Sequence, residues 1–140
     1  MAISYTVELT PTAEKVYGRL FHDAQTCLET GDVSNSKVTL FNMIEEALNK
    51  IIPNDPFAPE RSLYGALSGA FRVKKGRFRI CYAGSSDQKR IVVLYISDSL
   101  RKAGDSNDPY AIFTKLVKSG KFDEVFDKLG IRRPIRRGTV

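Results

Sequence analysis

A stretch of twelve residues near the middle of the chain constrains the fold more than any other segment. It reads Phe71-Arg72-Val73-Lys74-Lys75-Gly76-Arg77-Phe78-Arg79-Ile80-Cys81-Tyr82. Two runs that alternate apolar and polar residues flank a glycine, a pattern typical of two strands joined by a tight turn. The fold is therefore predicted to contain an antiparallel β-hairpin at this point.

Five of these twelve residues are cationic. Because successive side chains of a strand point to opposite faces, Arg72 and Lys74 share one face of the first strand. The corresponding face of the second strand carries Arg77, Arg79 and Cys81, and its other face is apolar. No Asp or Glu occurs from residue 62 to residue 85, so these cations lack acidic partners nearby in the sequence. The hairpin is predicted to present a cationic face suited to phosphate.

The 140-residue chain is 42% hydrophobic and 27% charged, which predicts one globular domain with a core. Its longest apolar runs, such as 91–96, are too short to span a bilayer, and its first residues lack the features of a signal peptide. We therefore expect a cytoplasmic protein that does not contact a membrane. Cys27 and Cys81 are expected to be buried, inert thiols in a reducing compartment.

The first half of the chain is expected to form a strand and a helical hairpin. Alternation predicts a half-buried strand over residues 3–9, and Thr10 or Thr12 can cap a helix that ends at Gly31. Apolar residues at helical spacing predict a second helix from 38 to 51. Three prolines between 53 and 59 predict a loop within the domain.

The second half is expected to complete a sheet and end in helices. The apolar run within residues 90–97 predicts a central strand covered on both faces. Asp108 is a suitable N-cap and Pro109 a suitable first residue for a helix up to Gly120, with a short helix following over 122–129. This order predicts an α+β domain whose helices pack on one face of the sheet.

Common catalytic sets are missing from the sequence. His22 is the only histidine, so no histidine pair exists for metal binding or acid–base catalysis, and a surface or packing role is expected for it. Neither a glycine-rich phosphate loop nor a nucleophile elbow occurs. The aspartates at 98, 105 and 108 suit caps and turns better than a magnesium site. We predict no metal and no cofactor.

With these sets excluded, the side chains left for catalysis are the cations of lysine and arginine and the phenol of tyrosine. An RNA phosphodiester can be cut without metal when its own 2′-hydroxyl attacks the phosphorus, provided that groups move the protons and cations stabilise the phosphorane. Arginines at 72, 77, 79 and 101 would disfavour a further positive charge, which suits Lys74 or Lys75 to accept a proton. The alternative is a solvated cationic strand that only keeps the sheet soluble.

The order of these residues resembles the RelE/ParE superfamily of bacterial type II toxins. The resemblance runs from Leu63 to Tyr110. It is carried by Leu63-Tyr64-Gly65-Ala66-Leu67-Ser68-Gly69-Ala70-Phe71-Arg72-Val73, by Gly76-Arg77-Phe78-Arg79-Ile80-Cys81-Tyr82, by residues 91–97, by Leu100-Arg101-Lys102 and by Tyr110. It implies a RelE/ParE-like fold over residues 1–131, with an N-terminal strand, a long helical hairpin, an antiparallel three-stranded meander and C-terminal helices. Residues 132–140 are expected to form a basic, flexible tail.

The resemblance also implies roles for individual residues. Lys74 takes the position of a strand cation and is the better candidate for the general base, while Arg79 takes that of the arginine that holds the phosphate. Arg101 corresponds to the arginine after the last strand, acting on the phosphorane or leaving group, and Tyr110 to the tyrosine that orients the substrate. The remaining substrate-binding candidates are Arg72, Lys75, Arg77 and Lys102.

Two departures from the family pattern change these expectations. Arg72 stands where a lysine is common, and arginine is a poor base, so a binding role is expected for it. The segment between Arg101 and Tyr110 is longer than usual, which leaves open that Tyr110 only packs at the start of a helix.

Three functions remain open from the sequence. The first is a toxin that inhibits translation as an endoribonuclease, cleaving mRNA on the ribosome as RelE-like members do, and that a small antitoxin neutralises. The second is an inhibitor of DNA gyrase without nuclease activity, as ParE-like members are. The third is a catalytically silent member whose antitoxin complex binds operator DNA. The antitoxin is expected to be disordered before it binds and to cover the cationic face with an acidic amphipathic helix.

Overall fold

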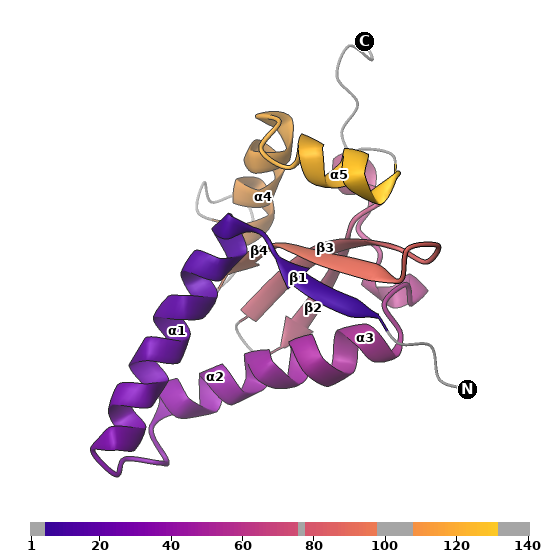
Figure 1. The fold of residues 1–140 in the computed structure, drawn as a ribbon. Helices are drawn as coiled ribbons and strands as arrows, with labels where there is room; N and C mark the ends of the chain where they lie inside the picture. The colour runs from indigo at the N-terminus through magenta and orange to yellow at the C-terminus, as the bar shows by residue number, and fades with distance from the viewer. Residues whose placement is uncertain (1–4, 76–77, 98–107, 132–140) are drawn as a thin grey trace.

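A four-stranded mixed sheet forms the centre of the protein. The computed structural model describes residues 5–75, 78–97 and 108–131 (Figure 1). The strands are β1 (Thr6–Leu9), β2 (Phe71–Lys75), β3 (Phe78–Ser85) and β4 (Arg90–Ser97), in the spatial order β1-β4-β3-β2. β1 runs parallel to β4, and β2, β3 and β4 form an antiparallel meander. The predicted meander and the central position of β4 are confirmed.

Five α-helices are labelled in the described part of the chain. They are α1 (Pro11–Glu29), α2 (Ser36–Glu46), α3 (Ile52–Asn54), α4 (Pro109–Lys118) and α5 (Asp123–Leu129). Local sequence signals mark the starts of α1 and α4 and the end of α5. Thr10 caps α1, its Oγ1 accepting a hydrogen bond of 3.2 Å from the backbone N–H of Ala13, and Asp108 occupies the N-cap position of α4. Gly130, with φ of 69°, ends α5 in the left-handed conformation that glycine adopts without strain.

The helical structure that begins with α2 continues farther along the chain than the sequence predicts. Residues Ala47–Ile51 form a π-helical turn, in which the N–H of Ile52 donates to the carbonyl of Ala47, and α3 carries the chain on to Asn54. Pro53 therefore lies inside helical structure and not in a loop. Proline has no N–H for the carbonyl four residues earlier and its ring crowds that carbonyl, so a wider turn before it relieves both conflicts.

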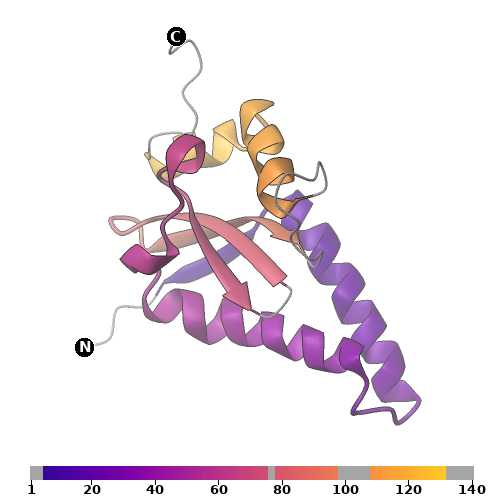
Figure 2. The ribbon, with the colours of Figure 1, turned by 180° about the vertical axis from the view of Figure 1, so that it is seen from behind.

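Helices cover both faces of the sheet, which corrects the expectation of a single covered face. α1 and α2 form a hairpin whose apolar residues pack against one face, whereas α4 and α5 pack against the other. Figure 1 shows α4 and α5 on one side of the strands and α2 on the opposite side, and Figure 2 shows the same layers from behind. The apolar run in β4 fits this arrangement because a strand between two helical layers is buried on both faces.

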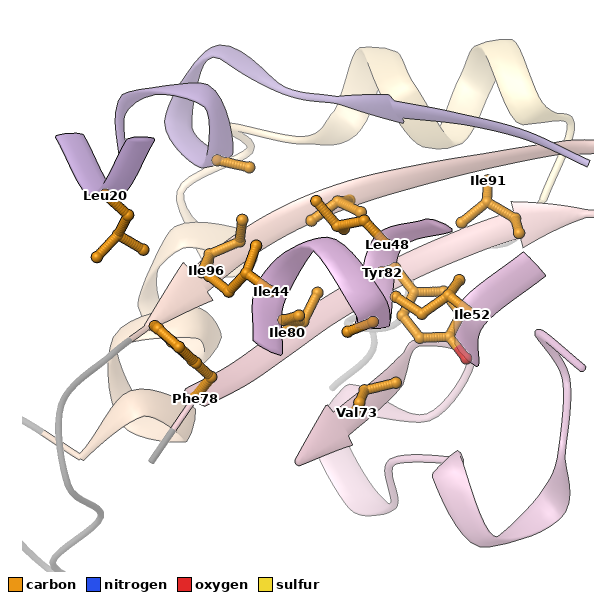
Figure 3. Close-up of a cluster of buried hydrophobic side chains, with 13 residues drawn as sticks. Leu20, Ile44, Leu48, Ile52, Val73, Phe78, Ile80, Tyr82, Ile91 and Ile96 are labelled. Atoms are coloured by element: carbon orange, nitrogen blue, oxygen red, sulfur yellow. The ribbon is translucent and has the colours of Figure 1, made fainter. Parts of the chain in front are cut away.

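The larger core lies between the sheet and the helical hairpin. Figure 3 shows Ile44, Leu48 and Ile52 from the helices meeting Ile80 and Tyr82 of β3, and all five side chains are buried. Ile44, Leu48 and Ile52 recur at intervals of four along α2 and its extension, so they share one helical face. Within the described residues, no helix is both long and apolar enough to cross a membrane.

An aromatic cluster fixes the segment after α3 against this core. The ring of Phe57 makes edge contacts with Tyr5 and Phe71, with centroid separations of 5.9 and 5.5 Å. The Tyr82 hydroxyl donates a 2.5 Å hydrogen bond to the carbonyl of Pro56. The proline-rich segment is therefore held at the sheet by packing as well as by its own backbone restraints.

Candidate nucleic-acid interface

Strand register brings the predicted cations of β2 and β3 together on one face. Lys74 pairs with Arg79, which pairs with Ser97 of β4, and residues paired in this way share a face of the sheet. Arg72 pairs with Cys81 in the neighbouring row. We call Arg72, Lys74 and Arg79 the cationic face. The apolar residues between them point into the core under the helical hairpin, as predicted.

The three cations differ in how firmly they are held. Arg79 is only 7% exposed, and its Nη1 donates a 3.1 Å hydrogen bond to the carbonyl of Phe78. Arg72 is half-buried and Lys74 is exposed. A guanidinium held by packing and by a hydrogen bond therefore lies beside an exposed amine on the same face of the sheet.

Cys81, in the same row as Arg72, offers no reactive thiolate. Burial raises the pKa of its thiol to about 12, and the nearby positive charge of Arg72 offsets only part of this effect. The expectation of an inert buried thiol is confirmed for Cys81. Cys27 is also a free cysteine but is half-buried, so the expectation of a buried side chain is wrong there.

A β-bulge in β4 adds residues to this face that the sequence analysis did not find. Tyr82 pairs with Val93 whereas Cys81 pairs with Tyr95, so Leu94 is an extra residue on β4. Val93 packs in the core under the helical hairpin, but Leu94 and Tyr95 both pack in the core under α4 and α5. The bulge thus reverses the alternation and puts Tyr95 and Ser97 on the side of the cationic face. Simple alternation could not reveal this, because the extra residue exists only relative to β3.

α4 packs on the same side of the sheet as the cationic face. Its Phe113 stacks on Tyr95 with centroids 6.1 Å apart. Tyr110 is half-buried in the first turn of α4, three residues before Phe113, and its carbonyl accepts a hydrogen bond from Thr114. Tyr110 thus lies in a helix that packs on the same side of the sheet as the cationic face, and its role stays a prediction.

Several predicted site residues are not described. Arg77, Arg101 and Lys102 lie outside the described residues, as does the side chain of Lys75. Their roles stay predictions, and so does the assignment of residues 132–140 as a flexible tail. His22 is exposed on α1, far in sequence from the hairpin, in agreement with a surface role. Among the described residues, no three His, Cys, Asp or Glu side chains cluster as a metal site would require.

The arrangement of strands and helices places the protein in a known class of fold. In fold, the chain is similar to a solved structure of the toxin–antitoxin complex RelBE2 from Mycobacterium tuberculosis, with a TM-score of 0.51 and 18% sequence identity. The superposition covers 69% of this chain and 93% of that one. The expected RelE-type fold, with its strand, helical hairpin, meander and C-terminal helices, is confirmed.

A sequence family identifies the chain more closely. The model of the YhaV toxin family, described as a toxin with endonuclease activity of a toxin–antitoxin system, matches residues 14–132. The chain belongs to this family. No curated protein matches its sequence. The predictions of a toxin of a toxin–antitoxin system and of a nuclease are confirmed, and neither comparison favours the gyrase inhibitor.

Proposed function

We propose that this toxin is an endoribonuclease that cleaves mRNA, with ribosome-bound mRNA as its substrate. The observation that carries the proposal is the pairing of Lys74 with the buried Arg79 on adjacent strands, on the side of the sheet that also bears Tyr95 and Ser97. Cross-strand partners have Cβ atoms about 5 Å apart, so both side chains can reach one phosphodiester. The cellular site of such a reaction is the cytoplasm.

The proposed reaction uses the substrate's own nucleophile. The 2′-oxygen of one ribose attacks the adjacent phosphorus, a new oxygen–phosphorus bond forms, and the bond from phosphorus to the 5′-oxygen of the next nucleotide breaks. Lys74 accepts the proton of the 2′-hydroxyl, and Arg79 binds the phosphoryl oxygens as their charge grows. The products carry a 2′,3′-cyclic phosphate and a 5′-hydroxyl. No redox step is involved. The leaving 5′-oxygen takes its proton from a solvent water molecule, and the protonated Lys74 returns a proton to solvent, so the net reaction moves one proton from the 2′-oxygen to the 5′-oxygen.

Further residues complete the proposed site. Arg101 is assigned to the phosphorane or the leaving oxygen, and Tyr110 to orienting the substrate. Arg72 binds a neighbouring phosphate, since arginine does not act as a base at neutral pH. Lys75, Arg77 and Lys102 are assigned to substrate binding. These roles rest on the order of the residues along the chain and on the position of α4 beside the sheet.

We also assign an antitoxin to the cationic face. The RelBE2 structure is that of a toxin–antitoxin complex, and the matched family belongs to such systems. An acidic segment that folds over Arg72, Lys74 and Arg79 would occupy the positions that bind phosphate and so prevent RNA from binding. Neutralisation would then be competitive with substrate.

A substrate that lacks the 2′-oxygen at the cleaved position tests whether this oxygen is the nucleophile. Purified toxin is incubated with a short mRNA, free or bound to ribosomes, and with the same mRNA carrying a 2′-deoxyribose at the cleaved position. We expect cleavage only of the all-ribose substrate, with cyclic phosphate at the new end. Cleavage of the deoxy substrate, or products with 3′-hydroxyl and 5′-phosphate ends, would overturn the proposed reaction.

Substitution of the proposed base gives a second readout. Lys74→Gln is expected to lower the single-turnover cleavage rate by about 10²- to 10⁴-fold, the range of general-base contributions. Lys37→Gln, at an exposed lysine of α2 on the far helical hairpin, is the matched control and should cleave at the wild-type rate. Equal rates for the Lys74 variant and the control would remove Lys74 from the mechanism.

A further inference from the structure

We propose that Tyr95 is a stacking site for one nucleobase of the RNA that the cationic face binds. This inference rests on the proposed function and adds a base-binding position to it. Tyr95 is a binding residue in this account, with no part in proton transfer.

The orientation of Tyr95 is fixed by contacts outside its own strand pair. The carbonyl of Leu94, the bulged residue, accepts a 2.8 Å hydrogen bond from the Thr10 hydroxyl, and the carbonyl of Val93 accepts one of 3.0 Å from the Thr10 N–H. Thr10 is also the N-cap of α1. The N-cap residue of a nineteen-residue helix therefore stabilises the bulge that turns Tyr95 toward the cationic face.

The ring itself is held in one plane. Tyr95 and Phe113 stack with an interplanar angle of 11° and centroids 6.1 Å apart, an offset arrangement. Phe113 is fully buried and in turn contacts Phe122 at 6.0 Å, so the supporting ring is fixed by the core under α4 and α5. Tyr95 is only half-buried although it borders this core. A rigid, partly accessible ring loses little conformational freedom when a base stacks on it.

Its neighbours complete a nucleotide-sized set of groups. Tyr95 pairs with Cys81, and Cys81 pairs with Arg72, so a small buried side chain lies between the phenol ring and a guanidinium. Arg79 lies diagonally from Tyr95 in the next row. Aromatic rings for bases beside cations for phosphates are the usual means of holding single-stranded RNA. The set suits one base on Tyr95 with the adjoining phosphates on Arg72 and Arg79.

The test measures stacking and phosphate binding separately. The probes are short single-stranded mRNAs, free and bound to ribosomes, with a 2′-deoxyribose at the cleaved position and a single abasic residue moved stepwise through the flanking positions. Binding is measured for the wild type, Tyr95→Leu, Tyr95→Phe and Arg79→Ala. We expect Tyr95→Leu to weaken binding of intact RNA roughly 5- to 150-fold, the value of one base stack, and Tyr95→Phe to bind like the wild type.

The abasic series separates a binding role from a packing role. At one position, loss of the base should weaken wild-type binding as much as Tyr95→Leu does, and should have no added effect on that variant. Tyr95→Leu should leave the slope of log affinity against log salt concentration unchanged. Arg79→Ala should lower the magnitude of this slope by about 0.7, the value for one lost phosphate contact. If Tyr95→Leu only disturbed packing, the variant would bind more weakly than the wild type by the same factor at every abasic position.

Each remaining outcome is decisive. If Arg79→Ala weakens binding while Tyr95→Leu binds intact RNA like the wild type, the stacking site is overturned and the proposed function stands. If effects of Tyr95→Leu and of base removal add at every position, the stacking site is overturned as well. If the wild type binds intact RNA neither free nor on ribosomes, the proposed function is overturned, and the stacking site is overturned with it.

Discussion

Tyr17 on α1 donates a short hydrogen bond to the carboxylate of Glu45 on α2, and Asn49 donates a 3.2 Å bond to the other oxygen of that carboxylate. These contacts tie the two arms of the helical hairpin together through polar groups at the edge of the core. Partial burial, and then the hydrogen bond and charge of Glu45, raise the pKa of the Tyr17 phenol to about 12. The hairpin therefore depends on a protonated Tyr17.

This residue gives a prediction for alkaline stability. The folded pKa lies above the unfolded value of about 10, so the stabilisation is complete below pH 10 and is lost as the pH rises toward 12. Tyr17→Phe should lower the free energy of unfolding by about 1 kcal/mol at pH 8. Urea unfolding of both proteins at pH 8 and pH 11 should show this difference shrinking at the higher pH. A difference that grows with pH would contradict the assignment.

Thr10 has two structural functions: it caps α1, and its hydroxyl donates a hydrogen bond to the bulge of β4. Thr10→Ala should cost about 1–2 kcal/mol for the cap, with a further loss for the unsatisfied carbonyl of Leu94. Thr10→Ser keeps both hydrogen bonds and should cost less. Urea unfolding measures these values. Thr12→Ala, at the next threonine in the chain, is the control. An equal loss of unfolding free energy in Thr12→Ala and Thr10→Ala would show that the two hydrogen bonds of Thr10 do not stabilise the protein.

β3 contains a glycine that its neighbours require. A Cβ on Gly84 would lie 3.1 Å from the Arg90 carbonyl oxygen and 3.1 Å from Cε1 of Phe57. Gly84→Ala should therefore destabilise the protein by about 1–3 kcal/mol, the usual cost of overpacking. Gly18→Ala is the matched control because no atom lies within 4 Å of the added carbon, and it should stabilise α1 by about 0.5–1 kcal/mol. Thermal unfolding that ranks the two variants in the opposite order would refute the packing argument.

The elements could be predicted where the signals are local. The cap at Thr10, the pair Asp108-Pro109 and the alternation in residues 71–82 each depend on a few neighbouring residues, and each element appears where expected. Pro53 misled because the conflict that it creates was relieved by a π-helical turn. The packing of α4 and α5 on the second face of the sheet was not predicted, since the apolar run in β4 indicates burial on both faces but not which helices provide it.

Two hydrophobic cores share the central strands of the sheet. Ile80 and Ile96 pack under the helical hairpin, while Cys81 and Leu94 pack under α4 and α5. Since β3 and β4 contribute to both cores, loss of either should unfold the whole sheet. The protein is therefore expected to unfold in one cooperative transition.

Mild core substitutions on each face test this cooperativity. Ile44→Val should cost about 0.5–1.5 kcal/mol and Val117→Ala about 1.5 kcal/mol or more, each by lost burial and cavity formation. Both should lower the urea midpoint without changing the slope of the transition. Fluorescence and circular dichroism should give coincident curves. A separate early transition in Val117→Ala alone would mean that α4 and α5 unfold independently.

The site could be predicted only as far as strand alternation reaches. Arg72, Lys74 and Arg79 were placed on one face from the sequence, and the register confirms their placement. Tyr95 was not found, because the bulge that reorients it depends on pairing with β3 and on Thr10, more than eighty residues earlier in the chain. Long-range contacts of this kind leave no local pattern in a single sequence.

Primer extension on a reporter mRNA tests directly whether this toxin cleaves mRNA by means of Arg79. The mRNA is examined after brief induction of the wild type, of Arg79→Ala and of Arg19→Ala, an exposed arginine of α1 that serves as the control, and a ribosome-free reaction is run beside them. Because Arg79 is assigned to the reacting phosphate, we predict discrete cuts within the coding sequence for the wild type and Arg19→Ala, and none for Arg79→Ala. Intact mRNA alongside growth arrest by the wild type would contradict RNA cleavage and indicate another target.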